Sequence, residues 1–414
     1  MTQSNRDRLF YGSPLKRNAL AIIVLSVLVL ALVLAFFNLL AALAAFKPEA
    51  VTVFFQALLL SSLLSLVPIA VLWYLDRRER ESPLAMLTAF LWGGVIATGL
   101  SLPINSAIIL SIQHWLTTNP TIGAVLGSQA ALLLGAPLAG PLVEETIKGL
   151  GILALLLILS AEFDNMRDGF IYGALVGIGF NCLESALYVA QSFAAFDFAP
   201  WGLQLGARYS LFGLSGHALF SGLLGLFLGW AIQTTQGWLR ILAPIVGWIL
   251  AIAAHALSNA LPLLFTLAGA QIEQPTSTEA MTPPNPSFLE AFLQRSVLDL
   301  VLFVPFWALI ALLLWRSGIW ERNVIREELR AEVDTAVTPE EYELIRRDGI
   351  FQTRRIQGAN RRLAEALINA QNELAFRKHH VRKMGKDPNA DPLVQGWREE
   401  VNMIRGELNR TKLA

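Results

Sequence analysis

The sequence predicts an all-α polytopic membrane protein: a bundle of about eight transmembrane helices with a broken fourth segment, followed by a cytoplasmic helical tail. The mean hydropathy is +0.51, and the chain is 54% hydrophobic but only 15% charged. Apolar residues also gather in long runs, so a water-soluble fold is not a serious option. Basic and acidic residues are equal in number, at 32 each, which argues against nucleic acid as a partner.

Eight apolar runs are each long enough for the roughly 20 residues that a helix needs to cross a bilayer. They lie near residues 19–46, 51–74, 84–112, 124–160, 169–191, 209–232, 240–266 and 296–315. We therefore expect a short N-terminus over 1–18 and a transmembrane bundle over 19–316. A tail over 317–414 holds 18 of the 32 basic residues and 16 of the 32 acidic ones.

Basic residues are distributed unevenly between the runs. They stand before the first run and after the second and eighth, at Arg6, Arg8, Lys16, Arg17, Arg77, Arg78, Arg80 and throughout the tail. The segments 113–123 and 267–292 contain no Lys or Arg. Because basic loops stay in the cytoplasm, both termini are predicted to be cytoplasmic and 267–292 to be an outer loop.

The fourth run is too long for one span, because its 37 residues at about 1.5 Å each exceed a hydrocarbon core of about 30 Å. The sequence predicts a break at Pro137, Gly140 and Pro141. Residues 124–136 would form a re-entrant or outer-leaflet piece, and a new helix would carry Glu144 near its N-terminus.

Ionisable side chains stand inside four consecutive runs, where each costs roughly 2.5–3.5 kcal/mol. They are Glu144, Glu145, Lys148, Glu184, His217 and His255, with Asn259 four residues beyond the last. At the helical rise, Glu144, Glu184 and His255 lie about 22–24 Å from the inner membrane face, and His217 lies roughly 18 Å from it. We therefore expect them to meet in one layer in the outer half of the membrane.

Glu144, Glu145 and Lys148 are three and four residues apart, so they share one helix face and one ammonium can pair with both carboxylates. A structural ion pair is the plain alternative for these three residues. Peptide hydrolysis needs a base to activate water, donors for the oxyanion and an acid for the leaving amine. The combined set of polar side chains offers all three.

At these residues the chain resembles the PrsW-type intramembrane proteases, relatives of the CAAX-processing and bacteriocin-immunity membrane proteases. The resemblance rests on EExxK at 144–148, FxxxE at 180–184, a histidine at 217 and HxxxN at 255–259, in that order on successive runs. It covers about residues 84–266, the expected catalytic core.

The resemblance implies a glutamate-type endopeptidase of a prokaryotic cytoplasmic membrane that needs no metal cofactor. The implied catalytic residues are Glu144, Glu145, Lys148, Glu184, His217, His255 and Asn259. The implied substrate is a single-span membrane protein in the lipid bilayer, with an anti-sigma factor as one candidate.

Distinct roles are expected for these groups. Glu144 or Glu145 would be the base, tuned by Lys148 and Glu184. His217 would transfer a second proton or stabilise the oxyanion. The side chains of His255 and Asn259 would donate to the oxyanion.

Three alternatives stay open. Two carboxylates and two histidines can ligate a divalent metal, although the chain lacks the HExxH motif of zincins. Glutamate and histidine chains at mid-depth are also typical of proton- or ion-coupled transporters, but no inverted repeat is evident. An interaction scaffold that presents the tail would not need the membrane residues.

The tail shows the signature of a helix start at Thr338, Pro339 and Glu341. Two apolar stripes at helical spacing follow, and Gly385 lies between them. They comprise Leu363, Leu367, Ala370 and Leu374, then Leu393, Trp397, Val401, Ile404 and Leu408. We therefore predict a helical hairpin whose stripes pack on each other.

Overall fold

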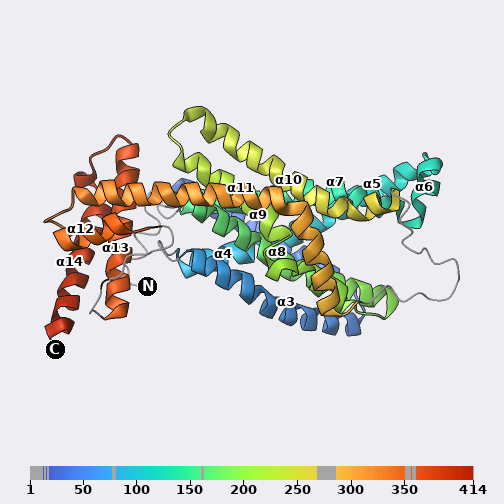
Figure 1. Cartoon of the computed structure of the whole chain (residues 1–414). Helices are drawn as coiled ribbons and strands as arrows, with labels where there is room; N and C mark the ends of the chain where they lie inside the picture. The colour runs from blue at the N-terminus through green and yellow to red at the C-terminus, as the bar shows by residue number, and fades with distance from the viewer. Residues whose placement is uncertain are drawn as a thin grey trace.

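A computed structural model describes residues 13, 15, 18–76, 81–159, 163–267, 286–349, 356 and 360–413. Every named element among them is a helix, and eight helical segments have the length and apolar composition to cross a membrane. The all-α polytopic prediction is therefore confirmed. The long helices run side by side along the molecule, and the C-terminal helices form a separate layer at one end (Figure 1).

The eight segments follow one another in chain order. They are α2 (Asn18–Ala44), α3 (Pro48–Leu75), α4 with η2 and α5 (Pro83–Leu91, Trp92–Ala97, Thr98–Thr117), α6 with η3 and α7 (Pro120–Leu126, Gly127–Gln129, Ala130–Ile158), α8 (Met166–Phe196), η5 with α9 (Ser210–Gly213, His217–Gln233), α10 (Gly237–Leu267) and α11 (Phe288–Arg330). The short π-helix η4 (Gly202–Gly206) joins α8 to η5. Most of the expected outer loop, 268–285, lies outside the described residues.

Helix α8 is the central helix, because 94% of its most apolar window is buried. Glycines let it approach α9 closely: a Cβ built on Gly173 would lie 2.3 Å from the carbonyl oxygen of Ser221, and one on Gly177 would lie 2.1 Å from that of His217. Both distances are far below van der Waals contact, so only glycine fits at these positions. The close approach sets the position of His217 relative to α8.

Replacing Gly177 with alanine is therefore expected to force α8 and α9 apart and to lower the free energy of unfolding by about 1–3 kcal/mol. Thermal unfolding of the purified protein in detergent measures this loss. Gly237→Ala is the matched control, since a Cβ there would meet nothing within 4 Å. Equal melting temperatures for the two variants would contradict the packing argument.

The fourth segment is broken, but the predicted position of the break is wrong. Helix α7 runs unbroken through Pro137 and Pro141, and the break falls at Gly127, whose φ of 73° ends α6. A proline removes only one backbone hydrogen bond, which neighbouring helices can compensate, whereas a left-handed residue ends a helix. Glu144 consequently lies inside a long helix rather than near the start of a new one.

The apolar run over 209–232 predicts one unbroken sixth helix, but the structure differs at its start. Leu211, Phe212 and Gly213 have φ of 48°, 59° and 76°, Gly216 has φ of 64°, and α9 begins only at His217. Each left-handed residue other than glycine costs about 1–3 kcal/mol, so the surrounding structure must hold this segment in place.

The hydrogen bonds that hold it come from α11. The hydroxyls of Ser210 and Ser215 donate to Oδ2 of the buried Asp299 at 2.6 and 2.7 Å, and the backbone N–H of Leu211 donates to Ser296 at 3.0 Å. Helix α11 thus fixes the segment that leads into His217.

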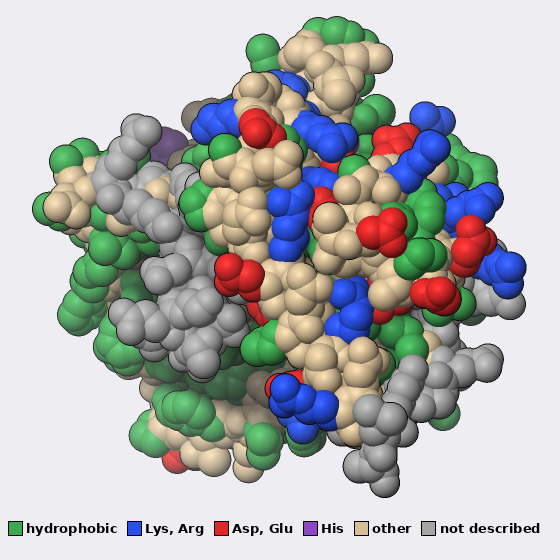
Figure 2. Space-filling model, turned by 90° about the vertical axis from the view of Figure 1, so that its left-hand side faces the viewer, with side chains coloured by type: hydrophobic (Ala, Val, Ile, Leu, Met, Phe, Trp, Pro, Cys, Tyr) green, Lys and Arg blue, Asp and Glu red, His purple; other side chains and the backbone are tan. Residues whose placement is uncertain are grey.

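The predicted helix start in the tail is confirmed, because Thr338 and Glu341 form a reciprocal capping box at the start of α12 (Pro339–Arg347). Helices α13 (Arg361–Lys383) and α14 (Pro392–Leu413) follow. Side chains from both predicted stripes share one buried core with the end of α11. Lys and Arg side chains are interspersed with Asp and Glu over the end of the molecule that carries these helices (Figure 2).

The tail contacts the membrane body at the ends of α8 and α9. The Lys383 ammonium donates to the carbonyl of Ile232 in the last turn of α9, and Arg167 near the start of α8 pairs with Glu321 at 2.7 Å. Helix α11 passes through residue 316, the expected boundary, without interruption. The tail is thus joined to the two helices that carry Glu184 and His217.

Candidate functional site

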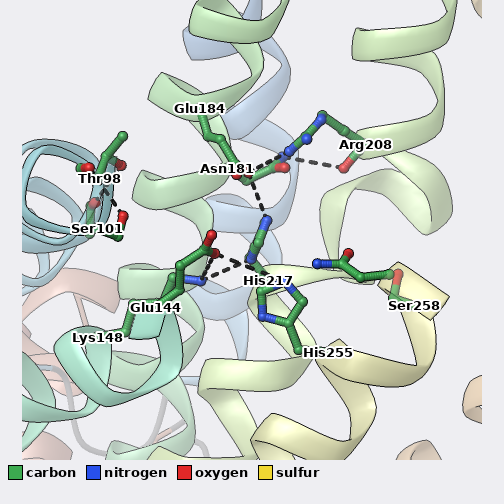
Figure 3. Close-up of polar contacts among 12 residues, drawn as sticks. Thr98, Ser101, Glu144, Lys148, Asn181, Glu184, Arg208, His217, His255 and Ser258 are labelled. Carbon is green, nitrogen blue, oxygen red and sulfur yellow. Dashed lines mark hydrogen bonds and ion pairs between the residues drawn. The ribbon is translucent and has the colours of Figure 1, made fainter. Parts of the chain in front are cut away.

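Six of the seven predicted site residues meet in one buried cluster. Helix α7 contributes Glu144, Glu145 and Lys148, and α8, α9 and α10 contribute one residue each, namely Glu184, His217 and His255. None of the six is more than 8% exposed. Figure 3 labels five of the six, and the side chains of these five point toward one another from the four helices.

Lys148 lies at the centre of the cluster. Its ammonium donates to Glu145 Oε1 at 2.8 Å, to His217 Nδ1 at 2.9 Å and, at a longer 3.4 Å, to Glu144 Oε2. The same nitrogen lies 3.7 Å from the ring centroid of Phe180, within the range of a cation–π contact. One positive charge is therefore shared between two carboxylates, an imidazole and an aromatic face.

The two adjacent glutamates differ in how fully their oxygens are used. Glu145 Oε1 accepts from Lys148 and from His255 Nδ1 at 3.0 Å, and its Oε2 accepts from the Ser221 hydroxyl at 2.9 Å. Glu144 Oε1 accepts from the Asn105 amide at 3.0 Å, whereas the one hydrogen bond to its Oε2 from the described residues is the long one from Lys148. Glu144 Oε2 is therefore the more available carboxylate oxygen.

His255 is oriented by stacking and by one hydrogen bond. Its ring stacks on Phe220 with the centroids 4.9 Å apart and an interplanar angle of 15°. Because the Glu145 carboxylate can only accept, the bond at Nδ1 makes that nitrogen the donor and leaves the lone pair of a neutral ring on Nε2. His255 Nε2 lies 3.9 Å from Glu144 Oε2.

Asn259 is the predicted residue that the structure does not join to the cluster by a hydrogen bond. Its amide donates to the Ala136 carbonyl on α7 at 3.2 Å. It still borders the cluster, since a Cβ built on Gly140 would lie 3.3 Å from both Asn259 Nδ2 and Glu144 Oε1.

Sequence reasoning missed the partners that complete the cluster. They are Asn105 on α5, Asn181 on α8, Arg208 before α9 and Ser221 on α9. Asn105 is a polar residue inside an apolar run, and Arg208 is a basic residue on the side of the membrane where Lys and Arg are otherwise scarce. The sequence alone could therefore have pointed to Asn105 and Arg208, whereas Ser221 resembles any small packing residue.

The cluster also has the donor chemistry of a metal site. One ligand atom from each of Glu144, Glu145, His217 and His255 lies within 4.8 Å of all the others, and all four residues are buried. Two carboxylates and two imidazoles suit zinc and related divalent ions. The Lys148 ammonium, however, already lies within 3.4 Å of three of these groups, so a metal ion would compete with it for the same lone pairs.

Comparison with known proteins adds an independent observation. Residues 81–310, which contain the whole cluster, match the family described as PrsW family intramembrane metalloprotease. Protease PrsW of Geobacillus kaustophilus is 29% identical over 157 residues, which are 38% of this chain and 59% of that protein. Protease PrsW of Clostridioides difficile is 26% identical over 170 residues, which are 40% of this chain and 63% of that protein.

Protease PrsW of Bacillus subtilis is 33% identical over 92 residues, which are 22% of this chain and 38% of that protein. The chain thus spans less than two thirds of the length of these curated relatives. No solved structure matches the chain.

Proposed function

Because the chain belongs to the PrsW family of intramembrane proteases, we propose that it hydrolyses peptide bonds of membrane-anchored proteins within the bilayer. The observation that carries this proposal is the meeting of six buried ionisable side chains from four spans. Incubating the purified protein with single-span membrane proteins, followed by mass spectrometry of the cut ends, tests it. An anti-sigma factor is one candidate substrate of this class.

The base is Glu144. Its Oε2 and the His255 Nε2 lone pair lie 3.9 Å apart, a separation that one bridging water can span. Glu144 takes a proton from this water as the water oxygen attacks the scissile carbonyl carbon. It then returns the proton to the amine nitrogen as the C–N bond breaks.

Glu145, Lys148 and His255 leave Glu144 free to act as the base and stabilise the charge that develops on the oxyanion. Glu145 holds Lys148 and His255 in position, and the Lys148 ammonium provides the positive field beside the developing oxyanion. The hydrogen bond at His255 Nδ1 makes Nε2 an acceptor for water. Lys148 therefore stabilises the oxyanion in place of His255, which the sequence analysis paired with Asn259 in this role.

The site lies in the outer half of the bilayer. Along the helices, Glu144 is about 21 Å from Ile158, His217 about 24 Å from Gln233, and His255 about 27 Å from Gly237. Those three helix ends lie on the side of the tail, which we place in the cytoplasm of a prokaryotic cell.

Topology is tested with single cysteines in a variant whose native cysteine has been replaced. We expect a cysteine at His114, an exposed residue of α5, to react with a membrane-impermeant maleimide in intact cells. A cysteine at the exposed Met384 in the tail should react only after permeabilisation. Labelling of both sites from the same side would contradict this orientation.

A metal-dependent protease is the second candidate, favoured by the family description and by the donor set. Glu144, Glu145, His217 and His255 would hold the ion, which would supply Lewis acidity toward the scissile carbonyl. In that case Lys148 would have to leave the centre of the cluster, where it now donates to three of the four ligands.

Chelation distinguishes the two candidates. Since Lys148 already supplies the positive charge in the cluster, we expect a strong chelator to leave the rate of cleavage unchanged within about twofold, and added zinc not to raise it. Cleavage is measured before and after dialysis against the chelator. Loss of activity on chelation with recovery on metal addition would establish the metal-dependent mechanism instead.

A further inference from the structure

Arg208 enters the cluster through a set of contacts that the proposed chemistry does not use. Its Nη1 donates to Glu184 Oε2 at 2.5 Å and its Nε donates to Gln204 at 3.0 Å. Its guanidinium carbon lies 4.5 Å from the ring centroid of Tyr188, and its own carbonyl accepts from the Asn181 amide at 3.2 Å. Figure 3 shows Arg208 reaching toward Glu184 and Asn181.

Three of these partners form one surface of α8. Asn181, Glu184 and Tyr188 are three and four residues apart, so they follow one another along the same face of the helix. A planar guanidinium can donate along its edge while an aromatic ring covers its face, which an ammonium cannot do. The site is thus shaped for arginine and fixes both its head group and its backbone.

The ion pair with Arg208 determines the charge of Glu184 and its role as a hydrogen-bond acceptor. A guanidinium in a protein is always charged, and a buried carboxylate paired with it is an acceptor only. The oxygen that binds Arg208, Glu184 Oε2, also lies 2.9 Å from His217 Nε2. His217 must therefore donate through Nε2.

The opposite side of the His217 ring requires the same tautomer. Nδ1 lies 2.9 Å from the Lys148 ammonium, which has no lone pair and can only donate. A neutral His217 with its proton on Nε2 satisfies both neighbours, whereas a proton on Nδ1 would set two donors against each other.

We infer that Arg208 is a positioning residue of the proposed protease: it holds Glu184 as a charged acceptor and thereby locks His217 in the Nε2–H tautomer. This inference rests on the proposed function. The tautomer of His217 affects Glu144 through the position of Lys148. While Nδ1 accepts one ammonium proton, Lys148 stays 3.4 Å from Glu144 Oε2, which leaves that oxygen free to act as base.

The experiment compares Arg208→Met with wild type in two measurements. The first is the ¹⁵N NMR spectrum of histidine-labelled protein, in which the His217 signal is identified by its loss in His217→Gln. We expect the Nε2–H tautomer in wild type. In Arg208→Met, Glu184 no longer holds the Nε2 proton, and Lys148, which also has Glu144 and Glu145 as acceptors, does not fix the tautomer alone, so a tautomer mixture is expected. The second is steady-state cleavage of a single-span substrate, in which we expect kcat to fall roughly 10²-fold with little change in KM.

Arg208→Lys keeps the charge but loses the fork of donors, so its kcat should lie between those of wild type and Arg208→Met. Arg240→Lys, an exposed arginine at the start of α10, is the matched control and should behave as wild type. If the methionine variant is not recovered folded, Arg208→Gln carries the same expectations, because it retains hydrogen bonding without the charge.

A wild-type tautomer in a folded Arg208 variant that lacks the charge would overturn the inference, and so would a wild-type kcat. The NMR measurement needs no substrate. Absence of cleavage by the wild-type protein would therefore count against the proposed function, whereas the tautomer would still test the role of Arg208.

Discussion

Glu144→Gln is expected to lower kcat for cleavage of a single-span substrate by roughly 10³-fold, because it removes the base and preserves its size. The substitution leaves an amide oxygen for the Asn105 donor, so the folded state should persist. Substrate binding should change little, since the lost interaction is needed only in the transition state. Steady-state kinetics and a binding assay on the same preparation measure both quantities.

Glu145→Gln serves as the comparison for this prediction. Glu145 accepts three hydrogen bonds, and a glutamine there would direct its NH₂ group at one of the donors. We therefore expect a loss of both activity and stability, by about 1–3 kcal/mol, because the hydrogen bonds from Lys148 and His255 lose their charged acceptor. Normal cleavage by Glu144→Gln together with inactive but stable Glu145→Gln would reverse the assignment of the base.

Lys148→Met is expected to have the largest effect on stability, about 3–5 kcal/mol, because it leaves buried carboxylates without their cation. Lys148 is fully buried and pairs with Glu145 at 2.8 Å. Cleavage should be lost as well. Urea or thermal unfolding in detergent measures the stability change, and Lys386→Met at an exposed position of the tail is the matched control.

A double variant separates the charge effect from the loss of packing. Adding Glu145→Gln to Lys148→Met removes one of the unpaired carboxylates. The double variant should therefore be more stable than Lys148→Met alone, a coupling that independent sites do not show. Additive losses from the two substitutions would mean that the ion pair contributes little to folding.

Hydropathy and motif spacing predict much of this structure, because bilayer thickness and the cost of buried charge act directly on the sequence. The eight spans follow from apolar runs of sufficient length. The meeting of Glu144, Glu184, His217 and His255 follows from counting residues at the helical rise. Both arguments need only the period of a helix and the width of a membrane.

Other features depend on contacts between distant segments and could not be predicted in the same way. A proline such as Pro141 usually marks the end of a helix, yet α7 continues because the bundle supports it. The irregular segment before His217 is held by Asp299 on α11, 84 to 89 residues later. Arg208 lies between η4 and η5 and meets Glu184 of α8 across 24 residues of sequence.

The transporter alternative makes a different prediction for the same residues. A proton relay through Glu144 and His217 would give proton-coupled flux in liposomes and no cut substrate. Glutamine variants of Glu144 and His217 would then lose the proton-coupled flux, and no variant would cleave the substrate.

Cleavage of a single-span membrane protein by the purified protein, in liposomes prepared with ¹⁸O-labelled water, tests the proposed intramembrane proteolysis most directly. Mass spectrometry then identifies the new ends of the substrate. We predict a cut within the membrane span, ¹⁸O in the new carboxyl terminus, and loss of this product in folded Glu144→Gln. Absence of cut ends, with an ion flux that Glu144→Gln abolishes, would contradict it.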